Sequence, residues 1–241
     1  MERRYFTEEN ASKIDVIRSR IGFWKARGLI DEAETRLLVA DLLVAANRVA
    51  NTAGTYGCFL RHWSQRAAQP LELRERKLRS EPCIKAITNV DASQILTSRR
   101  DLAYFDPPYT KRQYVAYYHV LETITLWDEP AVSGKTGLQP WKSLASDFCY
   151  ESRALAALRK LVASSGAGRI ILSYSDVGHV TVGDIRTVIG EFGRFESLNL
   201  ESIGRHSSQR TSPGSRSLFN EYLFVIEPYT TQAEAVHLRC A

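Results

Sequence analysis

Residues 102–113, LAYFDPPYTKRQ, constrain the fold more than any other stretch of the chain. The four apolar residues that open it predict a short buried strand, and Asp106 follows that strand directly. Pro107 and Pro108 each fix φ and lack a backbone N–H, so regular structure stops there. The chain must therefore leave a sheet at this point, with a carboxylate, stiff outward-facing carbonyls and the ring of Tyr109 in the turn.

Strands and helices alternate from about residue 81 onward. Predicted strands cover 83–92, 102–105, 168–175 and 221–228, and predicted helices cover 93–98, 117–127, 152–165 and 183–192. This alternation indicates an α/β fold with a mainly parallel sheet whose faces are covered by helices. The Ser/Gly/Arg-rich segment 205–217 is expected to be a loop.

The first 80 residues have a different pattern. Apolar residues recur at helical spacing in 10–27, where Asn10 is the expected N-cap, and again in 31–50. Residues 58–67 are expected to form a short third helix. We therefore predict a helical region at 1–80 and an α/β region at 81–241.

Composition narrows the function classes. The net charge of +5 and the pI near 9.0 permit a polyanionic partner. No apolar run approaches the roughly 20 residues of a membrane span, and the N-terminus lacks a signal peptide's apolar core, so a cytoplasmic protein is expected. The four cysteines share no metal-ligand spacing, so we expect reduced, mostly buried thiols and no metal site.

The turn after residue 105 predicts a specific chemistry. Ligands of open parallel sheets bind beyond the carboxyl ends of the strands. There, Asp106 and the Pro107 carbonyl would accept the two N–H groups of an exocyclic amine, while Tyr109 stacks on its ring. A base in a duplex must be flipped out to reach such a slot. The alternative is a plain strand-end turn, since Asp-Pro-Pro favours turns as well.

The motif and its surroundings resemble one enzyme family. FDPPYTKRQYVAYYHVLETI followed by GKTGL, together with RRYFTEENASKID, ANTAGTYGCFLRHW, ILSYSD and NEYLFVIE, is similar to Dam-like adenine-N6 DNA methyltransferases of restriction–modification systems. The resemblance implies a Rossmann-like sheet, transfer of a methyl group from S-adenosylmethionine to a flipped-out adenine, and a helical region that contacts target DNA. It makes Asp106, Pro107 and Tyr109 the adenine-activating residues, with Pro108 shaping the turn.

The donor side of the resemblance is incomplete. Asp91 falls where related enzymes hold the adenine part of the methyl donor, and Asp106 is the second predicted contact with that donor. An N-cap role for Asp91 is equally compatible. The Phe-x-Gly-x-Gly loop of the family is absent from the sequence. We expect a chain that lacks the first strands of the sheet, either truncated or completed by a separate N-terminal half. Weak binding of the donor would follow. The alternatives are an RNA exocyclic-amine methyltransferase and an inactive DNA-binding remnant.

Several polar residues are candidates for contacts with DNA. The loop at 50–59 could read base edges or could be a simple helix–helix turn. The basic run from Arg61 to Arg79, with Arg66, Arg74, Arg76 and Lys77, could hold phosphates or form a solvated charged helix. Tyr174 is expected to wall the adenine pocket. The His119 and Glu122 pair is expected to serve packing or hydrogen bonding. The full set of predicted DNA contacts is Asn51, Thr55, Tyr56, Arg61, Lys111, Arg112, Gln113, Tyr174, Arg205 and Arg210. A cognate restriction endonuclease is a further expected partner.

Overall fold

The computed structural model describes residues 2–78, 85–203 and 218–230. The chain divides into two compact units. The helical unit comprises Met1–Ile84 and Tyr114–Leu144, and the sheet unit comprises Lys85–Gln113 and Ala145–Ala241. A division at a single point near residue 80 does not describe this arrangement, because 114–144 leave the α/β region and join the helical unit. The chain leaves the sheet unit after Gln113, just past the turn that follows Phe105, and returns to it at Ala145.

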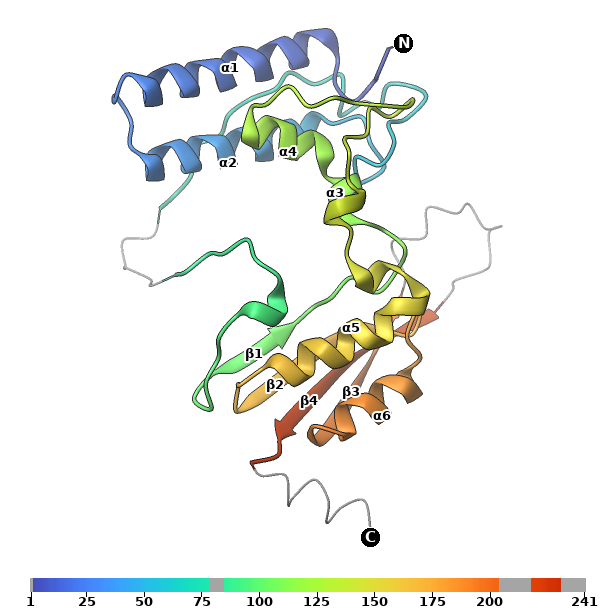
Figure 1. Cartoon of the computed structure of the whole chain (residues 1–241). Helices are drawn as coiled ribbons and strands as arrows, with labels where there is room; N and C mark the ends of the chain where they lie inside the picture. The colour runs from blue at the N-terminus through green and yellow to red at the C-terminus, as the bar shows by residue number, and fades with distance from the viewer. Residues whose placement is uncertain (1, 79–84, 204–217, 231–241) are drawn as a thin grey trace. The chain divides into compact units, whose positions relative to one another are not determined.

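The helical unit is built on two long helices, α1 (Glu8–Ala26) and α2 (Glu32–Val49), with the shorter α3 (Tyr114–Tyr117) and α4 (His119–Leu126) (Figure 1). The predicted N-cap of the first helix was wrong. Thr7 caps α1 through a bond from the Asn10 amide, whereas Asp31 and Glu34 form a reciprocal capping box on α2. The expected helix at 58–67 is absent, and turns and bends take its place.

Asn10 has a different role from capping. Its side chain is buried (2% exposed), donates to the carbonyls of Ala67 and Gln69, and accepts from the Leu71 amide at 2.8 Å. These bonds fix the irregular segment 64–71 against α1. The core beneath it contains Ile14, Leu42, Val49, Leu71 and Ile124.

Within the described residues, the sheet unit has four strands in the order β1-β2-β4-β3. These are β1 (Leu102–Phe105), β2 (Arg169–Ser175), β3 (Gly193–Ile203) and β4 (Leu218–Pro228). β1 pairs parallel with β2, but β2 with β4 and β3 with β4 are antiparallel. The described sheet is therefore mixed and mostly antiparallel, which corrects the prediction of a mainly parallel one. The prediction missed β3, because charged and polar residues interrupt its apolar alternation.

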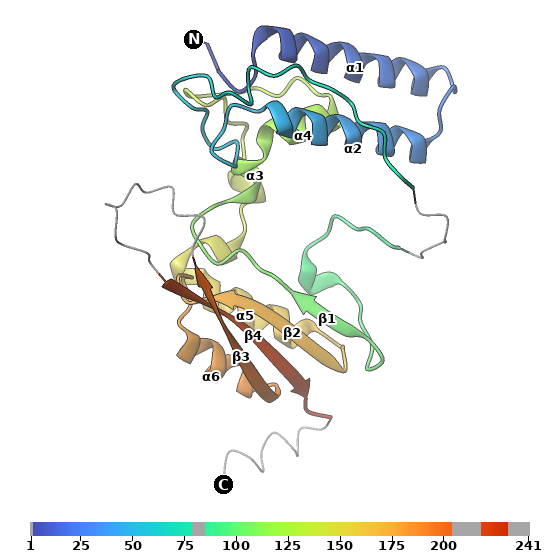
Figure 2. The ribbon, with the colours of Figure 1, turned by 180° about the vertical axis from the view of Figure 1, so that it is seen from behind.

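Helices cover one face of this sheet. α5 (Glu151–Ser164) and α6 (Val182–Gly190) lie in front of the strands in Figure 1, and in the reverse view of Figure 2 the strands stand in front of them. Leu158 and Ile185 pack there against Ile170, Leu172 and Phe224, all fully buried. Short 3-10 turns occur at Ala92–Gln94, Lys142–Leu144 and Asp147–Cys149.

The strand predicted at 83–92 is not found in its described part. Residues 85–91 lie outside any strand, and 83–84 fall outside the described residues. The remaining strands and helices predicted after residue 100 are present. In the described ranges, no helix is long and apolar enough to cross a membrane.

Replacing Asn10 by alanine tests the anchoring of the 64–71 segment. The change leaves a buried amide and two carbonyls without their partner, so the free energy of unfolding of the helical unit should fall by about 1–3 kcal/mol. All four tryptophans belong to this unit, so urea unfolding followed by tryptophan fluorescence reports on it selectively. The exposed neighbour Ser12→Ala is the matched control and should change stability by less than about 0.5 kcal/mol. Equal stability of the two variants would contradict the anchoring role.

Candidate active site

The turn after β1 lies at the carboxyl edge shared with β2. Phe105 pairs with Leu172, so Asp106 leaves the sheet beside the last residues of β2. Pro107 is buried, whereas the Asp106 side chain is exposed. Its carboxylate makes no hydrogen bond or ion pair within the described parts of the chain. An exposed carboxylate without a partner in the described residues therefore follows β1, on a turn that two prolines stiffen.

Two tyrosines pack together next to this carboxylate. The rings of Tyr109 and Tyr174 have centroids 5.6 Å apart and planes inclined by 58°. The Tyr109 carbonyl accepts from the His179 amide at 2.8 Å, and the Tyr174 hydroxyl accepts from the Val180 amide at 3.1 Å. Tyr174 is buried and Tyr109 partly so. The loop after β2 thus holds both rings in place.

The environment keeps these phenols protonated at neutral pH. Burial raises the pKa of Tyr109, and the Glu221 and Asp106 carboxylates raise it further, against a smaller lowering by Arg112. Burial is also the main cause of the raised pKa of Tyr174. Neutral aromatic rings beside a carboxylate suit stacking on a flat, uncharged base. Neither tyrosine is poised to act as a base.

The residues just after the turn divide into exposed and buried ones. Lys111 and Arg112 are exposed. Gln113 is 5% exposed, and its amide exchanges two hydrogen bonds with the backbone of Ser146. This burial corrects the expectation that Gln113 contacts DNA, because both ends of its side chain are committed to the fold.

Asp91 caps the 3-10 turn at Ala92–Gln94. Its Oδ1 accepts from the amide of Ser93 at 2.9 Å and from the Ser93 hydroxyl, and these two bonds lower the pKa of the carboxyl. The capping interpretation of Asp91 is therefore confirmed. Because both bonds use Oδ1, Oδ2 stays available to a ligand.

Sequence reasoning missed three residues around the site. Glu221 stands close enough to influence Tyr109, and Asn220 joins β4 to the end of β2 through the Asp176 carboxylate at 2.8 Å. His179 places a buried Nε2 atom without a partner in the described structure. No local signal marks Glu221 and Asn220, because antiparallel pairing across a long connection brings them there.

Comparison with known proteins now identifies the class. The profile of the D12 class N6 adenine-specific DNA methyltransferases matches residues 1–186, which include the whole turn. The chain belongs to this family. The relatives include the type II methyltransferase M.FokI of Planomicrobium okeanokoites, 35% identical over 227 residues, which are 94% of this chain and 35% of the relative. The type II methyltransferase M.NlaIII of Neisseria lactamica is 34% identical over 229 residues, 94% of this chain and 68% of the relative.

The chain spans about a third of M.FokI and of the modification methylase StsI of Streptococcus sanguinis, which is 33% identical to it. No solved structure matches the chain.

The loop at 50–60 in this D12-family chain is mostly scaffold. Asn51 is fully buried and bonds to the Leu60 carbonyl and the Ser64 amide. Tyr56 is 1% exposed, and its carbonyl accepts from the Tyr5 hydroxyl at 2.8 Å. Burial therefore corrects the expectation that the side chains of Asn51 and Tyr56 read bases. Thr55 is half-buried and remains accessible.

His119 is also part of this scaffold. It is 4% exposed, its Nε2 lies 3.1 Å from the Tyr56 carbonyl, and burial lowers its pKa. Glu122 is exposed on α4 and makes no bond to it. The structural role expected for His119 is confirmed.

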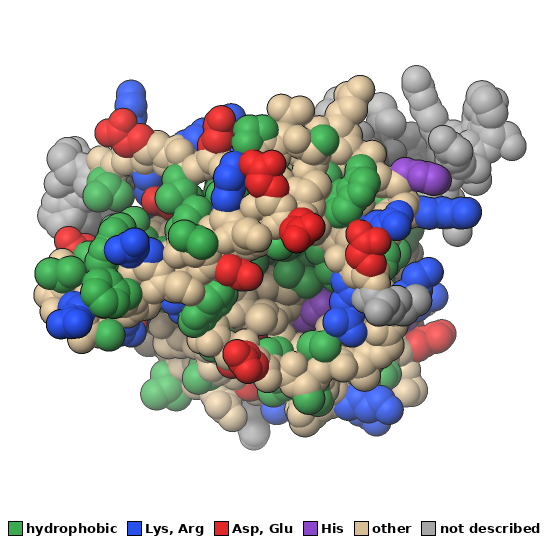
Figure 3. Space-filling model, turned by 90° about the horizontal axis from the view of Figure 1, so that it is seen from above, with side chains coloured by type: hydrophobic (Ala, Val, Ile, Leu, Met, Phe, Trp, Pro, Cys, Tyr) green, Lys and Arg blue, Asp and Glu red, His purple; other side chains and the backbone are tan. Residues whose placement is uncertain are grey.

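The arginines of the basic run fall into distinct groups. Arg66 donates to the carbonyls of Ala50 and Thr52 at 3.0 and 2.9 Å, and Arg76 forms an ion pair with Asp41. Arg61, Arg74 and Lys77 are exposed. Arg79, Arg205, Arg210 and Arg216 lie outside the described residues. Figure 3 shows lysines and arginines interspersed with acidic residues on one face of the molecule.

Gly178 provides a test of how the Tyr174 ring is held against Tyr109 in this D12-family chain. A β-carbon there would overlap the Tyr174 ring and lie 2.8 Å from its hydroxyl oxygen. Gly178→Ala should therefore displace Tyr174 from Tyr109 and cost about 1–3 kcal/mol of stability. Hydrogen–deuterium exchange of peptides covering 169–181 should become faster.

Gly183→Ala is the control, because a β-carbon at Gly183 meets only the Thr181 hydroxyl at 3.7 Å. Unchanged exchange in the Gly178 variant would show that the position of Tyr174 does not depend on the close approach of Gly178 to its ring.

Proposed function

We propose that the protein is a site-specific DNA adenine-N6 methyltransferase, the modification enzyme of a restriction–modification system, acting in the cytoplasm. The observation that carries the proposal is the unpaired Asp106 carboxylate on the rigid Pro107–Pro108 turn, beside Tyr109 and Tyr174. Membership in the D12 family and the names of the relatives support it. A cognate restriction endonuclease is the partner such a system requires.

The residues of the turn have defined roles in this proposal. The flipped-out adenine stacks on Tyr109, and Tyr174 closes the pocket behind that ring. Asp106 and the Pro107 carbonyl accept the two N6 hydrogens and raise the electron density on nitrogen. The activated nitrogen would take the methyl group that a bound donor supplies, with the bonding electrons staying on the donor's sulfur, and the surplus proton on N6 would leave for solvent. No strong base is needed.

S-adenosylmethionine, the donor implied by the family, would supply an electrophilic methyl carbon. The described residues offer it two carboxylates. The Asp106 carboxylate is free, and Asp91 keeps Oδ2 available for a ribose hydroxyl or an adenine amine. Both are hydrogen-bond acceptors, which fits the hydroxyl and amino donors of that molecule. We propose Asp91 and Asp106 as its contacts.

The donor half of the sheet is proposed to continue from β1. Within the described residues no strand pairs with the outer edge of β1, and Leu102 and Tyr104 on it are 58% and 57% exposed. Parallel strands added there, from a longer chain or a separate N-terminal half, would pair with the free backbone groups of β1 and complete a Rossmann-like methyltransferase sheet. The helical unit is proposed to recognise target DNA. The accessible candidates for contacts with DNA are Thr55 and Arg61 of the helical unit and Lys111 and Arg112 of the sheet unit, with Arg205 and Arg210 proposed from the sequence alone.

Replacing Asp106 by alanine tests this proposal. In the purified protein, supplied with its N-terminal half if that is a separate polypeptide, transfer of labelled methyl to duplex DNA should fall by at least about 100-fold, because the acceptor that activates the amine is lost. Binding to DNA should be unchanged. Asp128→Ala, an exposed carboxylate of the helical unit, is the control and should keep full activity.

Ribosomal RNA serves as the competing substrate in the same assay. Transfer to duplex DNA and not to RNA supports the proposal. Transfer to RNA alone would replace it with an RNA methyltransferase, and an active Asp106→Ala enzyme would remove Asp106 from the mechanism.

A further inference from the structure

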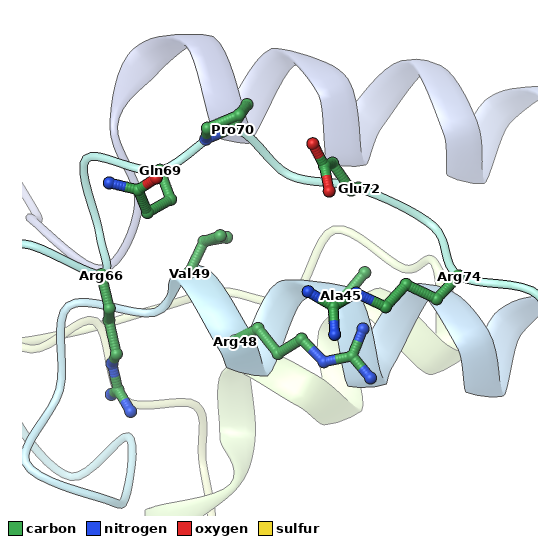
Figure 4. A pocket seen from close by; sticks show the side chains of 8 residues that line it. All are labelled: Ala45, Arg48, Val49, Arg66, Gln69, Pro70, Glu72 and Arg74. Carbon is green, nitrogen blue, oxygen red and sulfur yellow. The ribbon is translucent and has the colours of Figure 1, made fainter.

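A hollow of about 260 Å³ lies in the helical unit, away from the residues assigned so far. The last turns of α2 form one wall, with Ala45, Arg48 and Val49, and the extended segment after residue 65 forms the other (Figure 4). That segment contributes Arg66, Gln69, Pro70, Glu72 and Arg74. Three arginines therefore border a single hollow.

Two of these arginines have no acidic partner. Figure 4 shows the guanidinium groups of Arg48, from α2, and Arg74, from the opposite wall, turned toward one another. Neither forms an ion pair or a side-chain hydrogen bond within the described residues. Glu72 lines the hollow but points to its other side (Figure 4) and makes no ion pair with either of them. Two facing cations without a counterion repel one another unless an anion lies between them.

The third arginine explains why the hollow keeps its shape. Arg66 is turned away from the other two and holds the Ala50 and Thr52 carbonyls at 3.0 and 2.9 Å. Leu71, which is 6% exposed, is fixed by the bond from its amide to Asn10. Arg48 is held by α2, and the opposite wall is anchored at Leu71, three residues before Arg74, and at Arg76, two residues after it, through the ion pair with Asp41 of α2. A rigid site loses less entropy when it takes up a ligand.

We propose that Arg48 and Arg74 together hold one phosphodiester group of the DNA backbone. Guanidinium groups match the oxygens of a phosphate with paired N–H donors, and two facing groups can share a single phosphate. Such a contact positions DNA and contributes affinity without reading its sequence. This inference rests on the proposed function, which makes duplex DNA the substrate, and adds a defined phosphate contact to it.

Arg48 also has a purely structural explanation. It lies in the last turn of α2, where a cation interacts favourably with the helix dipole. That role predicts an effect of Arg48 on thermal stability and none on the salt dependence of DNA binding. Arg74 lies on no helix, so the dipole gives no reason for its position.

The test compares DNA binding by the wild type and by R48Q/R74Q across a salt series, measured by fluorescence anisotropy of a labelled duplex. Losing one phosphate contact should make the slope of log K against log salt shallower by about 0.9. Raising the salt from about 50 to about 200 mM should therefore weaken DNA binding by the variant about 3.5-fold less than it weakens binding by the wild type. The variant R48K/R74K keeps both charges and the cation at the end of α2. It should keep the wild-type slope but bind more weakly, because lysine lacks the paired donors.

The matched control is K25Q/R36Q, which removes the same charge from the same unit. Both of these cations are paired with Glu32, at 2.7 and 3.1 Å, so the slope should not change. A slope in R48Q/R74Q equal to that of the wild type would overturn the phosphate site, as would an equal loss in the control. If either result overturns the phosphate site while the wild type still transfers methyl groups to DNA, the proposed function stands without that site. A wild-type protein that shows no salt-dependent DNA binding would overturn both.

Discussion

Four residues of β1 pair in parallel with β2, and the arrangement of the site depends on this pairing. Parallel neighbours end at the same edge of a sheet, so Asp106 follows β1 beside the last residues of β2, which include Tyr174. The long crossover that a parallel pair requires passes through the helical unit before α5 returns to the sheet. The two prolines after Asp106 then prevent the turn from relaxing into regular structure. A free carboxylate next to two packed, mutually tilted tyrosine rings follows from these constraints.

Burial separates the residues that build the site from those that face a ligand. Asn51, Tyr56 and Gln113 are polar, yet their hydrogen-bonding groups are bound within the fold. Asp106 and the Arg48–Arg74 pair have unsatisfied charge and accessible side chains. Buried polar groups need internal partners, whereas exposed charges are satisfied by solvent. We therefore infer a ligand at Asp106 and at the Arg48–Arg74 pair from the fixed positions of these groups, which leave them free to bind one. On this basis we propose an acceptor site for a base at Asp106 and a cationic site for a phosphate at the Arg48–Arg74 pair.

Local patterns predicted the turn, its strand and the helices near it, because proline chemistry and apolar periodicity act over a few residues. Prediction failed where distant segments decide. β3 was missed because polar residues obscure its alternation, and the antiparallel pairing of β4 depends on β3. Asn10 fits a capping pattern, but tertiary bonds to 67–71 determine its role. The hydrogen-bonding residues of the loop around residue 51 suggested contacts with DNA, but the sequence does not show that Asn51 is fully buried. The Arg48–Arg74 pair joins residues that no local motif connects.

We propose that Asp106 activates the amino group of a DNA adenine. This role is tested most directly by sequencing genomic DNA with detection of modified bases, in cells that carry the gene at its own locus and in cells with an Asp106→Ala allele. The account predicts N6-methyladenine at one recurrent sequence motif in the first strain and its complete loss in the second. Methylation that persists in the Asp106→Ala strain, or a modification on cytosine in place of adenine, would contradict it.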